Sequence, residues 1–236
     1  MNPTPFAELS PDFVLDAVSA LGFEPDGRLL ALNSFENRVY QVGLEGDAPL
    51  IAKFYRPGRW TDAAIREEHA FSHELVEAEL PVVAPLVLDG ETLFDCDGQR
   101  VALFPRKGGR APELEGAGVT QWLGRLIARM HNVGARRPFA ARGRIDVASR
   151  VDAAAANVLD THLLPMHLAD RYERLVDAVA ERLDDRFAAI APATLRLHGD
   201  CHPGNLLWTD AGPHFVDLDD AAMGPAIQDL WMLMDG

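Results

Sequence analysis

Three polar side chains are closely spaced near the end of this sequence, in the stretch LRLHGDCHPGNLLWTDAGPHFVDLDD. Asp200 is followed five residues later by Asn205, and Asp217 lies twelve residues beyond Asn205. In such a set one carboxylate can accept or orient the proton of a hydroxyl group, while an amide oxygen and a second carboxylate can hold magnesium against phosphates. These residue types at this separation indicate phosphoryl transfer.

The elements expected to carry these side chains are a loop and a two-strand hairpin. Short strands are predicted at residues 195–197, 206–208 and 215–218. A loop with Asp200 and Asn205, followed by a hairpin that presents Asp217, brings the three groups together. Because alternate residues of a strand point to the same side, Asp219 can assist Asp217.

Zinc is the alternative metal to weigh at this stretch. His198 and His202 are four residues apart, with Cys201 between them. Pro203 and Gly204 break any helix that would align the two imidazoles, and a third ligand at zinc-like spacing is missing. The pattern therefore favours magnesium.

The run from His198 to Asp217 resembles the catalytic segment of the aminoglycoside phosphotransferase and choline kinase family, a branch of the kinase-like superfamily. The resemblance implies that Asp200 is the catalytic base and that Asn205 and Asp217 are the magnesium ligands. It also implies that His198 braces the catalytic loop. The family pattern favours Asp217 over Asp219 as the metal-binding carboxylate.

Lys53 lies in the apolar segment LIAKFY, in a chain whose 22 basic residues include only two lysines. Burying an ammonium group is costly unless it meets an anion. In kinases the equivalent strand lysine meets the nucleotide phosphates and a glutamate of the following helix, so Lys53 and Glu68 are expected in these roles. Glu68 is preferred to Glu67 because it shares the helix face of Ile65 and Phe71.

A phosphate-covering loop is expected in the stretch NSFENRVY, which has no Gly-x-Gly pattern. Small, polar Ser34 and the backbone N–H groups of the turn are expected to contact the phosphates instead. The adenine ring is expected against the backbone of residues 104–107, after the last strand of the N-terminal half.

The N-terminal half has the pattern of a small β-rich lobe. Ser10 caps a first helix with Pro11 at its first position, and Thr61 begins the main helix, with Trp60 and Ile65 as a hydrophobic staple around that cap. Strands are predicted at residues 29–32, 39–42, 50–54, 82–87, 93–95 and 101–104, the last two joined by a turn at 97–98.

The C-terminal half has mostly helical periodicity. Apolar stripes predict two helices, one through Leu123, Leu126, Ile127 and Met130, the other through Leu168, Tyr172, Leu175, Val176, Val179 and Leu183, and a last helix is expected near Ile227. The fold class is therefore α+β, a two-lobed protein-kinase-like fold. We expect an antiparallel N-lobe with one main helix at 1–104, a linker at 105–112 and a mostly helical C-lobe at 113–236.

Several blocks, including LNSFENRVYQV, AKFYRPGRW, FPRKGGR and FVDLDDAAMGPAIQDLWML, closely resemble a family of bacterial stress-response serine/threonine protein kinases with the aminoglycoside-kinase-like fold. This resemblance implies ATP as donor, Mg²⁺ as cofactor and protein serine or threonine hydroxyls as acceptors. It also associates Ser34 with the ATP site. The family continues with further helices beyond residues 231–234, so the C-lobe is expected to be short, as a natural short version or as a fragment.

The composition excludes some partners. The net charge is −14, which offers no basic surface to nucleic acid or to anionic membranes. The two cysteines offer no disulfide framework, and no signal peptide or membrane-spanning apolar run is present. We expect a monomer in the cytoplasm.

Alternative functions stay open at this point. The same chemistry with another acceptor gives a small-molecule kinase for an aminoglycoside, choline or homoserine. A truncated, non-catalytic nucleotide-binding module is a second alternative, and a metallohydrolase is the third.

Overall fold

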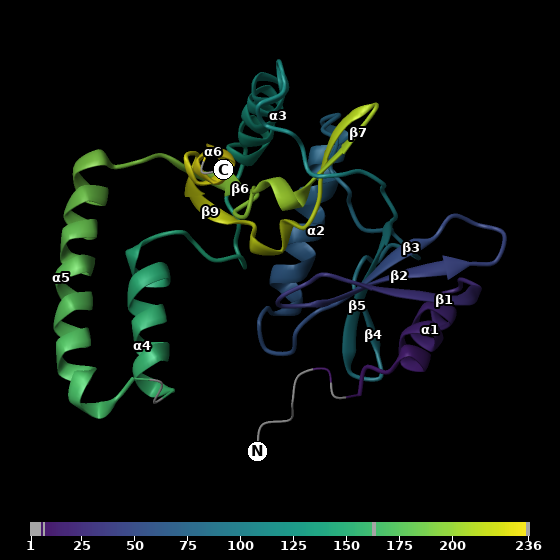
Figure 1. Ribbon diagram of the computed structural model, residues 1–236, viewed down its shortest axis with the longest axis horizontal. Helices are drawn as coiled ribbons and strands as arrows, with labels where there is room; N and C mark the ends of the chain where they lie inside the picture. The colour runs from purple at the N-terminus through teal and green to yellow at the C-terminus, as the bar shows by residue number, and fades with distance from the viewer. Residues whose placement is uncertain (1–5, 7, 162–163, 235–236) are drawn as a thin grey trace. The chain divides into compact units, whose positions relative to one another are not determined.

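The computed structural model describes residue 6 and residues 8–161 and 164–234. These residues divide into two compact units, which Figure 1 draws in one picture. The first consists of residues 1–126 and 202–219, and the second of 127–201 and 220–236. The segment 105–112 lies within the first unit, and the predicted division into lobes stays a prediction.

The first unit contains a five-stranded antiparallel sheet in the order β1-β2-β3-β5-β4 (Figure 1). Its strands are β1 (Pro25–Leu32), β2 (Arg38–Leu44), β3 (Leu50–Phe54), β4 (Phe94–Cys96) and β5 (Gln99–Pro105). Asp97 and Gly98, both with positive φ, form the tight turn between β4 and β5, as predicted.

Helix α1 (Pro11–Ala20) packs on one face of this sheet. The Ser10 side chain accepts a hydrogen bond from the backbone N–H of Phe13, which confirms the predicted cap. The helix buries Val14 and Val18 in a cluster whose strand members are Val42, Leu44, Leu50, Ala52, Phe54, Val101 and Leu103.

Helix α2 (Asp62–Glu77) begins at the predicted cap, where the Thr61 side chain accepts from the N–H of Ala64. Ile65 is buried with Ala102 of β5, and Trp60 packs against the same cluster, as the staple predicts. Because Ala102 alternates with Val101 and Leu103 along β5, this cluster lies on the opposite side of the strand from the α1 cluster.

The predicted strand at 82–87 is wrong. Only Val82 forms an isolated bridge there, with Phe215. Pro81 precedes this stretch and Pro85 lies within it, and a proline lacks the backbone N–H group that a continuous ladder requires.

The first unit also contains the predicted hairpin, made of β7 (Leu206–Thr209) and β8 (Gly212–Phe215). The strand predicted at 215–218 ends at Phe215, which corrects the argument that residues 217 and 219 alternate on a strand. Asp217 has a φ of +59°, and residues 218–220 form the 3-10 turn η3 (Leu218–Asp220). A residue in the left-handed region ends an extended strand.

The second unit holds a two-stranded sheet of β6 (Thr194–Leu197) and β9 (Ala222–Pro225), followed by α6 (Gln228–Met234). Helix α3 (Val119–Gly134) runs from the first unit into the second. Its last carbonyls, at Val133 and Gly134, accept hydrogen bonds at 3.0 and 3.4 Å from the buried guanidinium of Arg196 on β6. Arg196 thereby satisfies groups that a helix end leaves without partners.

Helices α4 (Ala153–Asp160) and α5 (Met166–Ile190) form an antiparallel pair after the short π-helix η1 (Ala148–Asp152). The helix predicted from the second apolar stripe is confirmed as α5, but none of its residues is buried. Leu175 is 62% exposed and Val179 42% exposed. No described helix is both long and apolar enough to span a bilayer.

Candidate active site

A hollow of about 360 Å³ lies inside the first unit. Its lining comes from the sheet, from α2, from the segment after β5 and from the hairpin with the residues that follow it. The residues that line it are Leu32, Asn33, Ser34, Val39, Ile51, Lys53, Glu68, Ser72, Val83, Phe104, Pro105, Lys107, Gly204, Asn205, Leu207, Val216, Asp217 and Leu218. Five of the six predicted site residues therefore line this one hollow.

Alternation along β3 directs Lys53 into this hollow. Its neighbours Ala52 and Phe54 belong to the α1 cluster, so the Lys53 side chain leaves the opposite face of the strand. Ile51, two residues earlier, lines the same hollow, as does Val39, which is the register partner of Lys53 on β2.

The Lys53 ammonium group is almost fully buried, with 6% of the side chain exposed, and is surrounded by acids. Its Nζ atom donates to Oδ1 of Asp217 at 2.7 Å and lies 3.4 Å from Oδ1 of Asp219. Burial alone would lower the pKa of Lys53, but the carboxylates of Asp217, Asp219 and Glu68 outweigh it and raise this pKa well above its ordinary value of 10.5. Lys53 is therefore a positive charge held inside the site.

Asp217 and Asp219 differ sharply in exposure. The Asp217 side chain is 49% exposed, whereas that of Asp219 is 5% exposed. Asp217 is thus open to a ligand in the hollow, and Asp219 is enclosed by protein groups.

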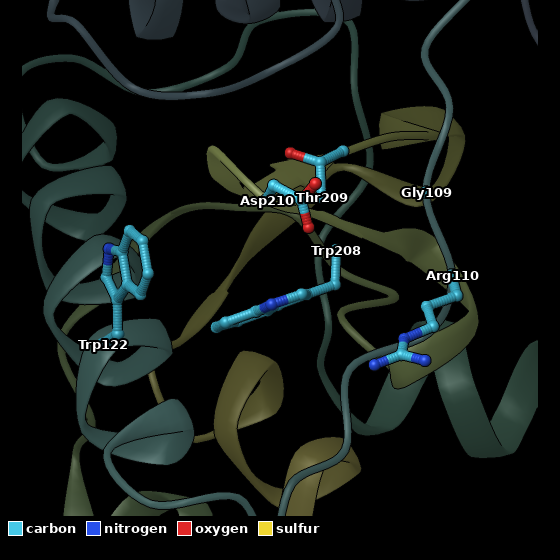
Figure 2. Close-up of a pocket in the computed structure, with 6 residues that line it drawn as sticks. All are labelled: Gly109, Arg110, Trp122, Trp208, Thr209 and Asp210. Carbon is cyan, nitrogen blue, oxygen red and sulfur yellow. The ribbon is translucent and has the colours of Figure 1, made fainter.

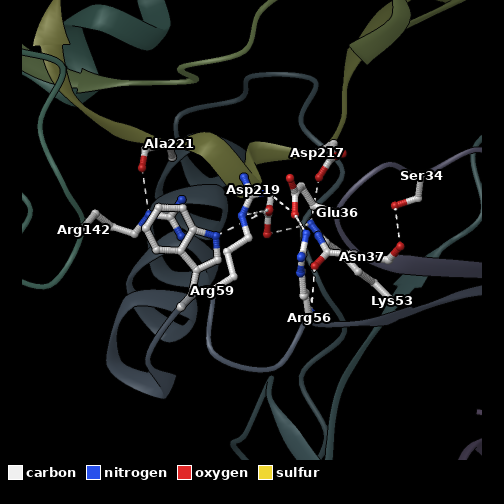
Figure 3. A network of polar contacts seen from close by, with 11 residues as sticks. Ser34, Glu36, Asn37, Lys53, Arg56, Arg59, Arg142, Asp217, Asp219 and Ala221 are labelled. Atoms are coloured by element: carbon white, nitrogen blue, oxygen red, sulfur yellow. Dashed lines mark hydrogen bonds and ion pairs between the residues drawn. The ribbon is translucent and has the colours of Figure 1, made fainter. Parts of the chain in front are cut away.

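Asp219 contacts side chains of the segment that follows β3, as part of a polar network (Figure 3). Its Oδ2 atom lies 3.4 Å from Nε of Arg59 and 3.5 Å from the indole nitrogen of Trp60. Arg59 also pairs with Glu36 at 3.2 Å, and Glu36 pairs with Arg56 at 2.6 Å. Sequence reasoning missed Arg56 and Arg59 as neighbours of the site, although the block AKFYRPGRW contains both.

Glu68 is buried on α2, with 2% of the residue exposed, and lines the hollow. Glu67 is half-buried and does not line it. The carboxylate of Glu68 is close enough to raise the pKa of Lys53. This geometry favours Glu68 over Glu67 as the acidic partner of Lys53.

Ser34 lies in the turn between β1 and β2, at the edge of the hollow. Its hydroxyl donates to the backbone carbonyl of Asn37 at 3.0 Å, and the Asn37 side chain accepts from the N–H of Arg56 at 3.1 Å (Figure 3). These bonds fix the turn against the segment after β3 without any Gly-x-Gly pattern.

Asn205 ends the 3-10 turn η2 (Pro203–Asn205), immediately before β7. Its backbone N–H donates to the carbonyl of His202 at 2.9 Å, and its carbonyl accepts from the N–H of Val216 at 3.1 Å. The second bond ties the start of β7 to the residue before Asp217, which brings Asn205 and Asp217 to the same hollow.

Asp200 lies in the second unit, in the loop after β6. The two residues before it are anchored by the fully buried carboxylate of Asp229 on α6, which accepts from the N–H of His198 at 3.1 Å and from that of Gly199 at 2.8 Å. Asp229 thereby holds the segment that immediately precedes Asp200. Gly199 has a φ of +85°, and a Cβ there would lie 2.0 Å from the carbonyl oxygen of Asp220, so this position requires glycine.

The donors that face the hollow suit a hard divalent cation. Asn205 offers an amide oxygen and Asp217 a half-exposed carboxylate, and Mg²⁺ is commonly held by one or two such protein ligands together with substrate phosphates and water. Lys53 adds a fixed positive charge. These donors match the kind of protein ligands that Mg²⁺ takes beside phosphates.

Comparison with known proteins gives concordant results. Residues 28–236 match the model of the phosphotransferase enzyme family. The chain is 43% identical over 235 residues to Stress response kinase A of Salmonella choleraesuis (strain SC-B67), covering all of this chain and 71% of that protein. Identity and coverage are the same for the serine/threonine protein kinase RdoA of Salmonella typhimurium (strain LT2).

Solved structures share the fold at lower identity. The amicoumacin kinase hAmiN, in complex with AMP-PNP, Ca²⁺ and Ami, is 19% identical with a TM-score of 0.74, covering 94% of this chain and 68% of that one. A microcompartment-associated aminopropanol kinase is also 19% identical, with a TM-score of 0.69 and coverage of 94% and 73%. The resemblance predicted from the sequence is confirmed: the chain belongs to the phosphotransferase enzyme family and has its α+β kinase-like fold.

Proposed function

We propose that this protein transfers the γ-phosphoryl group of ATP to serine or threonine hydroxyls of proteins, in the cytoplasm, as part of a bacterial stress response. Relatives with 43% identity carry the names stress response kinase A and serine/threonine protein kinase. The single observation that supports the chemistry is the hollow in which buried Lys53 meets Asp217, beside Asn205 and Glu68.

In this proposal ATP occupies that hollow. Its phosphates meet the Lys53 ammonium group and the turn that contains Ser34. Its adenine lies among Val39, Val83 and Leu207 and hydrogen-bonds to the backbone of residues 104–107. Glu68 keeps the ammonium group in position.

Asn205 and Asp217 would hold Mg²⁺. When bound there, the ion would supply positive charge against the phosphates during transfer. Lys53 stays charged in the hollow because three carboxylates keep its pKa high, so it adds to the same neutralisation.

Asp200 would accept the proton of the acceptor hydroxyl. The hydrogen bonds from the backbone of His198 and Gly199 to Asp229 hold the segment that carries Asp200. A base in such a loop needs a fixed backbone, because a displacement of about 1 Å can lower a rate 100-fold.

Two substitutions test these roles. Asp200→Asn is expected to abolish phosphoryl transfer while leaving the affinity for ATP nearly unchanged. Asp217→Ala should lose magnesium-dependent nucleotide binding as well as transfer. Normal turnover by Asp200→Asn, measured with labelled ATP and a protein mixture, would refute its assignment as base.

A small-molecule kinase is the second candidate. It is favoured by the solved structures with the same fold, which include an amicoumacin kinase and an aminopropanol kinase. An assay of labelled ATP with a protein mixture and, in parallel, with a panel of aminoglycosides and small alcohols separates the two. Transfer to the panel alone would replace the proposal, and magnesium-dependent binding without any transfer would indicate a non-catalytic module.

A further inference from the structure

A second hollow, of about 530 Å³, lies in the first unit (Figure 2). It shares no lining residue with the candidate active site. It is formed by the segment after β5, the start of α3 and the β7–β8 turn. Its lining residues are Gly109, Arg110, Trp122, Trp208, Thr209 and Asp210. None of these residues has a role in the proposed transfer reaction.

Two indole rings form the walls of this hollow. The rings of Trp122 and Trp208 stand at 80° to each other with centroids 5.4 Å apart, so they make a corner (Figure 2). Trp122 is 43% exposed although it is a large apolar side chain. Exposed aromatic rings that face a hollow are typical of binding surfaces.

The backbone around the two rings is built to hold them. At Gly212 a Cβ would lie 2.7 Å from the Trp122 ring, and at Gly109 a Cβ would lie 2.9 Å from Leu207. The backbone of Arg110 exchanges two hydrogen bonds with that of Trp208, at 3.1 and 2.7 Å. The corner is therefore preformed, and a ligand does not have to order it.

Strand β7 places the two hollows on opposite sides of one ribbon. Leu207 lines the candidate active site, and the next residue, Trp208, lines the second hollow. Successive side chains of a strand point to opposite faces. In the segment after β5, Lys107 lines the first hollow and Gly109 the second. A ligand in the second hollow therefore leaves the candidate active site free.

The charge around the corner suits a cation. Asp210 is exposed and borders the hollow together with the two indole rings, whose faces attract cations. Arg110 also borders it, and its guanidinium forms an exposed surface ion pair with Glu113 at 3.3 Å. The chain carries a net charge of −14, so the surroundings favour a positive partner as well.

We propose that the corner of Trp122, Trp208 and Asp210 docks an arginine or lysine side chain of a basic segment in the protein substrate. This inference rests on the proposed function, because it assigns a recognition element to a protein acceptor. The cationic group packs against the indole rings near the Asp210 carboxylate. The hydroxyl that is phosphorylated belongs to another residue of the same substrate.

The test uses a fluorescein-labelled peptide that carries two arginines among glycines and serines, with citrulline replacing both arginines in a matched peptide. Fluorescence anisotropy with the full chain should show binding of the arginine peptide and a Kd about tenfold weaker for the citrulline peptide. Trp122→Ala and Asp210→Asn should each weaken binding of the arginine peptide about tenfold. Trp122→Phe, which keeps a ring, should weaken it less.

Asp47→Asn is the matched control, because Asp47 is also an exposed acid in a turn of the first unit but lies outside the hollow. It should bind as the unchanged protein does. Equal binding of the two peptides, no binding of either, or an equal loss in Asp47→Asn would overturn the proposal. Free arginine that competes as strongly as the peptide would also overturn it, in favour of a small amine ligand.

Kinetics separate this proposal from the proposed function. In phosphorylation of a protein mixture, Asp210→Asn should raise KM for basic acceptors and leave kcat unchanged. If the unchanged protein phosphorylates proteins and Asp210→Asn does so with the same KM, only the docking site is wrong. If the arginine peptide binds but no protein is phosphorylated, the docking site stands and the acceptor assignment is wrong.

Discussion

Asp229→Ala offers the sharpest test of how the second unit holds the loop that contains Asp200. The Asp229 carboxylate is fully buried and meets the backbone N–H groups of His198 and Gly199 and, at 3.0 Å, Nε2 of His131 on α3. Alanine leaves these three groups without this acceptor. Each buried polar group that loses its partner costs about 1–3 kcal/mol, so the loss for three groups is expected to be about 3–9 kcal/mol. That is a large part of a total stability of about 5–15 kcal/mol.

Two milder substitutions, His131→Ala and Asp229→Asn, should each lower the free energy of unfolding by less than Asp229→Ala does. His131→Ala removes only one of the three hydrogen bonds, so it should cost about 1 kcal/mol. Asp229→Asn keeps one acceptor oxygen but turns an NH₂ group toward other donors, which should cost about 2–3 kcal/mol. Urea titrations monitored by tryptophan fluorescence measure the free energy of unfolding of all three variants.

Activity should fall with the loss of this anchor. The two backbone groups that Asp229 holds immediately precede Asp200, the proposed base, so kcat should decrease at least about tenfold in Asp229→Ala. Lys53 and Asp217 lie in the first unit, so ATP affinity should stay the same. An Asp229→Ala protein that unfolds at the same urea concentration as the unchanged one would refute the reasoning.

Three further predictions follow from individual contacts. Arg196→Ala should lower the unfolding free energy by about 2–4 kcal/mol in urea titrations, because the carbonyls of Val133 and Gly134 lose a buried donor. Maleimide labelling of the folded protein should modify half-buried Cys96 before Cys201, which is fully buried and whose thiol pKa is raised by burial; equal rates would contradict this. Partial burial would raise the pKa of Glu36, but Arg56 and Arg59 lower it below 4.5, so its stabilising effect is present above pH 4.5 and is lost as pH falls through the folded pKa. Glu36→Gln should therefore destabilise by less than about 1 kcal/mol at pH 7, and urea midpoints should converge with those of the unchanged protein in acid.

Local patterns in the sequence determined the helix starts, most strands and the family. Ser10 and Thr61 cap their helices as predicted because a cap depends on side chains within three residues of it. The residues from Asp200 to Asp217 carried the resemblance to the phosphotransferase family, which the comparison confirms. The roles of these residues stay predictions.

Only the tertiary structure decided which charges meet. Lys53 and Asp217 are 164 positions apart, and the 3.4 Å contact of Arg59 with Asp219 depends on where the turn after β8 ends. The left-handed backbone at Asp217 could not be read from an aspartate in an apolar run, because strand propensity is set by packing. The same holds for the corner of Trp122 and Trp208, whose residues come from a helix and a distant strand. Side-chain periodicity predicts elements, whereas contacts between elements require their packing in three dimensions.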